Sequence, residues 1–141
     1  IELRHQVVQW QRLLVAAERA KRELSTRDSA VIEVRDVALT AGGALHLRFE
    51  VSRGHFAELC KGIIERSLDT CRDALELSDI NPRELNAVYL SGGTSYIPAV
   101  REALGRFFGV PPKAAVPPER AVVTGAAIYA ALLHMGSVSE E

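Results

Sequence analysis

The stretch from Val88 to Pro98 constrains the fold of this chain more than any other part of the sequence. It reads Val-Tyr-Leu-Ser-Gly-Gly-Thr-Ser-Tyr-Ile-Pro, which predicts a short apolar strand, a double-glycine turn and the start of a helix. Glycine lacks a Cβ, so Gly92 and Gly93 let a ligand come close to the main chain. The first turn of a helix offers unpaired N–H groups. The pattern predicts an α/β unit with a place for an anion or part of a nucleotide, although such turns also arise from chain geometry alone.

The composition is that of a folded domain, or of one lobe of a larger domain. Of the 141 residues, 48% are hydrophobic and 25% are charged, which are values typical of globular proteins. The net charge is −1 and the sequence has no basic block, so we do not expect a dedicated nucleic-acid-binding protein. No apolar run approaches about 18 residues, so we expect no membrane span. Because the sequence begins with Ile1 rather than methionine, we interpret it as an excised piece.

The cysteine and histidine pattern excludes two further kinds of site. Cys60 and Cys71 lie eleven residues apart in one predicted helix, a rise of about 16 Å, whereas a disulfide needs Cα atoms within about 7 Å. Free thiols fit a reducing, cytoplasmic compartment. The four histidines have no metal-ligand spacing with either cysteine, so we predict no metal site.

Hydrophobic periodicity predicts two helices around a hairpin in the first part of the chain. Residues 2–24 carry an apolar stripe at helical spacing, and residues 31–39 are β-branched and apolar enough for a strand. After a turn at Gly42 and Gly43, residues 44–51 alternate between an apolar face, with Leu45, Leu47, Phe49 and Val51, and a wet face, with His46, Arg48 and Glu50. Ser52 is a good N-cap for a helix over residues 53–77. The stripe of the first helix is Leu3, Val7, Trp10, Leu14, Ala17 and Leu24. The inward face of the second is Phe56, Leu59, Cys60, Ile63, Ile64, Leu68, Cys71 and Leu75.

The second part of the chain predicts a strand followed by two helices. The strand contains Val88, and the helices span about residues 95–108 and 119–134. We therefore predict an α/β fold in which residues 1–80 form one lobe, residues 81–136 form part of a second, and residues 137–141 form a polar tail. The edges of the Val88 strand lack partners in this chain, so we expect self-association through that strand or a loosely ordered second half.

Four polar residues share one face of the first helix. Glu18, Lys21, Arg22 and Ser25 are spaced at i, i+3, i+4 and i+7. One interpretation is a polar strip that holds a planar or hydroxylated ligand. The other is a solvated face with an ordinary Glu18–Arg22 pair. Lys21 also continues the apolar stripe at a position where a core residue is expected, which indicates the rim of a cleft.

Three segments together resemble the seventy-kilodalton heat-shock chaperones of the DnaK type. Residues 17–25 look like the polar helix of that family, residues 90–98 are similar to its adenosine-binding turn, and residues 121–127 resemble its second connecting helix. Residues 52–59 agree with the family as well, and the order and separation of the segments match. The resemblance covers essentially the whole chain and implies part of an actin-like ATPase domain.

The resemblance also implies which residues hold a nucleotide. Glu18, Lys21, Arg22 and Ser25 would hold adenine and ribose from one side. Gly92, Gly93 and Thr94 would approach the adenosine and α-phosphate from the other side, with Ile97 lining the base pocket. The cofactor would be ATP or ADP, with Mg²⁺ in the intact parent, and the fragment alone would bind nucleotide weakly or not at all. The phosphate-gripping hairpins and the metal-directing aspartates of the family would lie upstream of Ile1, so we expect no catalytic residue and no ATP hydrolysis in this chain.

Two positions depart from the family pattern. Tyr96 stands where the family usually has an arginine packed on the adenine, and although it can stack on the base it supplies no cation. Glu119 and Arg120 replace a typical Asp-Glu pair. Both departures are expected to change the affinity for adenine, and they indicate a diverged member of the family.

Other functional classes remain open at this point. The hairpin face with His46, Arg48 and Glu50 predicts either a docking surface for a nucleotide-exchange factor or a solvated sheet face. Other implied partners are co-chaperones and unfolded client proteins, the latter bound through a domain outside this chain. A sugar kinase or a filament protein would share the actin-like fold. A free-standing enzyme finds no support, since no catalytic triad or paired carboxylate is present.

Overall fold

The computed structural model describes residues 2–138 and divides the chain into two compact units, Ile1–Ile63 and Ile64–Glu141. The boundary falls within a long helix, α2 (Arg53–Leu77). The mixed α/β architecture, a two-stranded antiparallel sheet with four α-helices, confirms the predicted fold class and is consistent with part of an actin-like ATPase domain. Residues 139–141 of the predicted tail lie outside the described residues.

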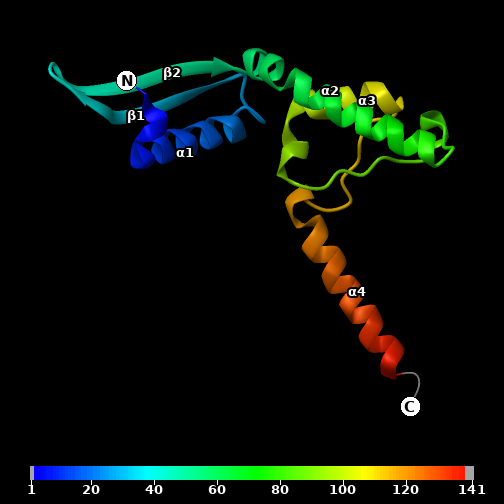
Figure 1. Ribbon diagram of the computed structural model, residues 1–141. Helices are drawn as coiled ribbons and strands as arrows, with labels where there is room; N and C mark the ends of the chain where they lie inside the picture. Colours follow the sequence, from blue (N-terminus) through cyan, green and yellow to red (C-terminus); the bar gives the residue numbers. More distant parts are fainter. Residues whose placement is uncertain (1, 139–141) are drawn as a thin grey trace. The chain divides into compact units, whose positions relative to one another are not determined.

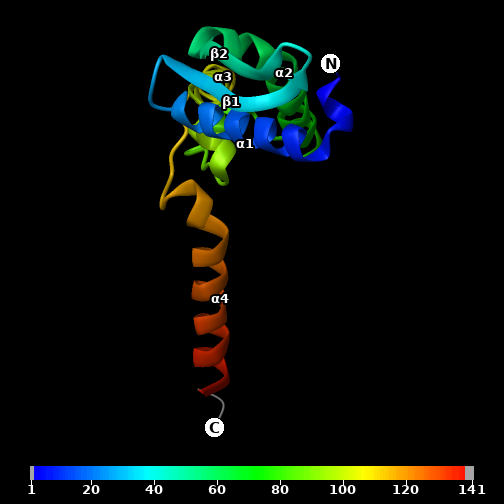
Figure 2. The same cartoon turned by 90° about the vertical axis from the view of Figure 1, so that its left-hand side faces the viewer.

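The first unit is built on a long hairpin with a helix along it. A 3₁₀ turn, η1 (Leu3–His5), precedes α1 (Val7–Glu23), which is followed by β1 (Ser29–Thr40) and β2 (Gly43–Ser52). Figures 1 and 2 both show α1 running beside the hairpin. Gly43 has a φ of 110°, a conformation that favours glycine, and it reverses the chain as the sequence predicts.

The hydrophobic core of this unit lies where α1 meets the hairpin and the start of α2. Ala20, Leu24, Ala30 and Val51 are buried together, and Ile32 and Phe56 pack against them. The start of α2 is fixed by Ser52, whose Oγ accepts a hydrogen bond from the His55 N–H at 3.1 Å, which confirms the predicted N-cap.

The predicted apolar stripe of α1 is confirmed in part, because Leu24 is buried and Leu3, Trp10 and Ala17 are half-buried. Val7 and Leu14 are exposed, at 71% and 44%. The packed face instead runs through Trp10, Leu13 and Ala17 to the buried Ala20 and Leu24. Ala20 is buried with Leu24 against Ala30 and Val51, so a small residue forms part of this packed face. Lys21 is therefore at the margin of the core face and does not replace a core residue.

The hairpin contains an irregularity that its alternation does not reveal. The register shifts between Val34 and Ala38, and Asp36 adopts a φ of 49°. The Asp36 N–H donates to His46 Nδ1 at 3.0 Å, so a side chain of β2 satisfies the bulged main chain. The predicted division of β2 into one apolar and one wet face is wrong in part, because Leu45 and Phe49 are exposed as well.

The second unit has little regular sheet. After α2 come η2 (Pro82–Glu84), η3 (Gly93–Tyr96), α3 (Pro98–Phe108), η4 (Pro118–Arg120) and α4 (Ala121–Val138). The predicted Val88 strand is reduced to one parallel bridge, Tyr89 with Lys113. Leu90 N–H donates to the Lys113 carbonyl at 2.9 Å, and Lys113 N–H donates to the Val88 carbonyl at 2.8 Å. With only this short partner among the described residues, the segment cannot build a sheet.

Helices α2 and α4 bury less than their sequences suggest. The predicted inward face of α2 is half-buried at Phe56, Cys60, Ile64, Leu68, Cys71 and Leu75, but Leu59 and Ile63 are exposed, and no described residue of α2 is fully buried. Helix α4 continues beyond the predicted end at His134, and its larger apolar side chains up to Met135 are exposed. These faces have the character of surfaces that pack against further protein.

Candidate functional site

The predicted polar face of α1 is an ion-pair cluster centred on Glu18. One carboxylate oxygen, Oε2, pairs with the Lys21 ammonium, and the other, Oε1, accepts from Arg22 Nε at 3.0 Å. Lys21 and Glu18 are half-exposed, and Arg22 is exposed. The Glu18–Arg22 pair predicted from the spacing is therefore confirmed. The cluster carries a net charge of +1 and presents donors and an acceptor side by side.

The two cations set the protonation state of Glu18. Hydrogen bonds from Lys21 first and Arg22 second lower the pKa of Glu18 below its ordinary value. The carboxylate therefore stays ionised and available as a hydrogen-bond acceptor over a wider pH range. Ser25, one turn further, is half-buried, and its N–H donates to the Arg22 carbonyl at 3.1 Å. All four predicted residues of this face thus lie on the last turns of α1 or directly after it.

The double-glycine turn is held by main-chain geometry. Gly92 adopts φ 86° and ψ 156°, a region that is almost restricted to glycine. Its N–H donates to the Pro118 carbonyl at 2.8 Å, and its carbonyl accepts from the buried Ser95 hydroxyl at 2.7 Å. Both the entry to the turn and its exit are thereby fixed to neighbouring segments.

The turn does not lead straight into an α-helix. The predicted helix over residues 95–108 is wrong at its start, because η3 occupies Gly93–Tyr96 and α3 begins only at Pro98. Proline at the first helical position is favourable, whereas the preceding residue is held in an extended conformation, which separates the two elements. Within the described part of the chain, the N–H groups of Gly93 and Thr94 have no hydrogen-bond partner, and both residues are exposed. Ile97, which follows the turn, is buried.

The two positions that depart from the family pattern are bonded to each other. The Tyr96 hydroxyl donates to Glu119 Oε2 at 2.6 Å. This hydrogen bond raises the pKa of Tyr96 and lowers the pKa of Glu119. The sequence shows both changes but not their contact, which joins residues 23 positions apart. The complementarity of a phenol donor at position 96 and a carboxylate acceptor at position 119 is the signal in the sequence that could indicate the pair.

The predicted site residues form two groups, and each group is described within its own unit. Glu18, Lys21, Arg22 and Ser25 belong to the first unit, and Gly92, Gly93, Thr94, Tyr96 and Ile97 belong to the second. The second group is brought together with Pro118 and Glu119 of η4. The sequence indicates Glu119 only as a departure from the family pattern and gives no sign of the contact with Pro118.

Other kinds of site find no support in the described residues. Among residues 2–138, no group of three or more histidine, cysteine or acidic residues is arranged to hold a metal ion. Cys60 and Cys71 are free thiols, as their spacing predicts. In the same range, no helix has the length and apolar character needed to span a membrane.

Comparison with known protein families gives a match over almost the whole sequence. A family model described as Hsp70 protein matches residues 1–140. The match includes both groups of candidate site residues and the hairpin between them.

Proposed function

Because the chain belongs to the Hsp70 family, we propose that it supplies the adenosine-binding side of an ATP/ADP cleft in a protein-folding chaperone. The observation that carries the proposal is the Gly92–Gly93 turn, which lies in a segment resembling the adenosine-binding turn of that family. Its main chain is fixed, and the exposed N–H groups of Gly93 and Thr94 have no protein partner within the described residues. Such groups suit the oxygens of a nucleotide phosphate.

In this proposal the α1 cluster contacts the nucleoside. Glu18 accepts a hydrogen bond from a ribose hydroxyl, and Lys21 and Arg22 lay their aliphatic stems against the base while their charged ends remain solvated. Ser25 adds a hydroxyl at the end of the row. The lowered pKa of Glu18 supports the acceptor role, since the ionised carboxylate is the form that accepts.

Tyr96 takes the place of the cation that the family usually has against the base. Its ring is 44% exposed, and its hydroxyl is bound by Glu119. An aromatic ring held in this way provides a stacking surface, so we propose that Tyr96 stacks on adenine and that Ile97 lines the pocket below it. Without the cation, we expect the affinity for adenine to differ from that of relatives with arginine here.

The remaining activities belong to the whole protein in this proposal. We expect no ATP hydrolysis by residues 1–141 alone, because the phosphate-binding hairpins that the family uses with Mg²⁺ are not among the segments that resemble it here. Exchange factors, co-chaperones and unfolded clients are the expected partners, in a cytoplasmic setting. We also retain the expectation of self-association through the segment around Tyr89.

A second candidate function is exchange-factor docking on the hairpin. His46, Arg48 and Glu50 are all exposed on β2, which favours this surface. The two functions are separated by an amide NMR titration of the labelled protein that carries this chain, first with ADP and then with an exchange factor. Nucleotide binding predicts ADP-induced shifts confined to residues 18–25 and 92–97. Shifts with the exchange factor alone, confined to β2, would favour docking and contradict the proposed adenosine site.

A further inference from the structure

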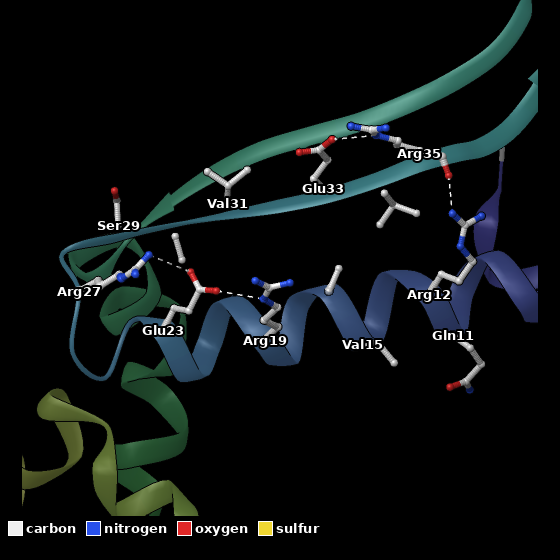
Figure 3. Close-up of a pocket in the computed structure, with 13 residues that line it drawn as sticks. Gln11, Arg12, Val15, Arg19, Glu23, Arg27, Ser29, Val31, Glu33 and Arg35 are labelled. Atoms are coloured by element: carbon white, nitrogen blue, oxygen red, sulfur yellow. Dashed lines mark hydrogen bonds and ion pairs between the residues drawn. The ribbon is translucent and has the colours of Figure 1, made fainter.

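A groove of about 950 Å³ runs between α1 and the outer edge of β1 in the first unit. Figure 3 shows its lining, with side chains from α1 on one side and from β1 on the other. Its apolar part includes Val15, Ala16, Ala30 and Val34, next to the core of the unit. None of the polar residues assigned to the nucleotide lines this groove, so it is a separate surface.

The charge of the groove is positive. It is lined by Arg12, Arg19, Arg27 and Arg35 but by only two acidic residues, Glu23 and Glu33. Glu23 is shared by Arg19 at 3.1 Å and Arg27 at 3.8 Å, and Glu33 pairs with Arg35 at 3.4 Å. The arginine side chains of these pairs are between 71% and 83% exposed, so they can exchange partners at little cost.

Arg12 differs from the other three arginines. Its guanidinium donates to the main-chain carbonyl of Arg35 at 2.7 Å and has no carboxylate partner among the described residues. The positive charge of Arg12 therefore lies at one end of the groove and is held by a main-chain carbonyl group, which is neutral, instead of by a carboxylate. Arg27 lies at the other end of the same groove (Figure 3).

The main chain of β1 faces the groove with an unpaired edge. In the described part of the chain, β1 pairs only with β2. The Asp28 carbonyl accepts from the Arg53 N–H on the β2 side, whereas the Arg35 carbonyl accepts from Arg12 on the opposite side. Because main-chain groups alternate in direction along an antiparallel strand, the N–H and C=O groups of Val31 and Glu33 point away from β2.

We propose that this groove binds an extended acidic peptide segment of a partner protein, which adds as a third strand on the outer edge of β1. Alternating main-chain donors and acceptors match a peptide backbone. The surplus of two positive charges selects glutamate and aspartate side chains, and the apolar floor accepts the residues between them. A nucleic-acid strand has no main-chain groups that match the edge of a β-strand.

The test is binding of a fluorescein-labelled decapeptide of alternating glutamate and valine to the chain, measured by fluorescence anisotropy. We expect saturable binding that weakens with salt, and at least about threefold weaker binding after Arg12→Gln with Arg19→Gln. Arg66→Gln, the same charge change on α2 outside the groove, should leave binding unchanged. A peptide with glutamine in place of glutamate should bind more weakly than the acidic peptide.

Strand addition has its own readout. The amides of Val31 and Glu33 should exchange their hydrogens more slowly when the acidic peptide is present, and this measurement needs no variant. Equal binding of the glutamine peptide, unchanged exchange at both amides, or tighter binding of a single-stranded oligonucleotide than of the peptide would each overturn the proposal.

Discussion

The two groups of candidate site residues, one on α1 and one at the glycine turn, are built in different ways. On α1, charged side chains pair with one another on a half-exposed helix surface. At the glycine turn, the main chain itself is fixed. Gly92 adopts a conformation that is almost restricted to glycine, its carbonyl accepts a hydrogen bond from the buried Ser95 hydroxyl, and its N–H donates one to the Pro118 carbonyl of η4. A surface built of ion pairs tolerates substitutions, and its stability depends on salt. A turn fixed by its main chain tolerates few substitutions, and its stability depends little on salt. Substitutions in the turn should therefore cost more than substitutions on α1.

The largest effect is expected at Gly92. Replacing it with alanine forces a Cβ into the φ 86°, ψ 156° conformation, which should lower the free energy of unfolding by about 1–3 kcal/mol. Gly93→Ala is the matched control, because Gly93 has no positive φ and open space around its Cβ position. Urea unfolding of both variants measures the difference. Equal destabilisation would show that the turn is not restrained at Gly92.

The second-largest effect is expected at Ser95. Its buried hydroxyl donates to the Gly92 carbonyl at 2.7 Å, so Ser95→Ala should lower the free energy of unfolding by about 1 kcal/mol. The exposed neighbour Thr94 provides the control, since Thr94→Ala should stay within about 0.5 kcal/mol of the unchanged chain. If the two alanine variants unfold alike in urea, the hydroxyl does not hold the turn.

The Tyr96–Glu119 hydrogen bond should give a smaller effect that depends on pH. Glu119 has a lowered pKa in the folded state, so its stabilisation is present above its unfolded pKa and is lost as the pH falls through the folded value. Tyr96→Phe removes the donor and should flatten this part of the stability profile between neutral and acid pH. Thermal unfolding across that range tests it, and an unchanged acid-side slope would contradict the assignment.

The smallest effect is expected on α1. Glu18→Gln should reduce stability slightly at low ionic strength and hardly at all at high salt, because its ion pairs are solvent-exposed and screened. The lowered pKa of Glu18 predicts that the difference disappears as the pH falls through the folded pKa of this group. Melting curves at two salt concentrations measure this. A large loss of stability that does not depend on salt would contradict this prediction, because Glu18 would then be as strongly restrained as the glycine turn.

The same contrast explains what the sequence predicts well. Side-chain spacing on one helix is local, so the Glu18–Arg22 pair follows from the i, i+4 rule alone. The hairpin, the turn at Gly43 and the Ser52 cap are also local, and all three are present. The glycine pair predicts the turn after Leu90, because few other residues reach the positive φ that Gly92 adopts there.

What the sequence does not predict depends on contacts between distant residues. The pairing of Tyr96 with Glu119 joins positions 23 residues apart. Burial on α1 also depends on distant residues, since Ala20 and Leu24 pack against Ala30 and Val51 while Leu14 stays exposed. The Val88 segment has the composition of a strand, but a strand also needs partners, and among the described residues only Lys113 provides one.

The central proposal is that the α1 face and the glycine turn both contact an adenosine nucleotide. Photocrosslinking with 8-azido-ADP, followed by peptide mapping, tests it most directly in the protein that carries this chain. We predict labelled peptides from both residues 18–25 and residues 92–97, each lost when unmodified ADP competes. Labelling of only one of the two segments, or labelling that ADP does not reduce, would contradict the account.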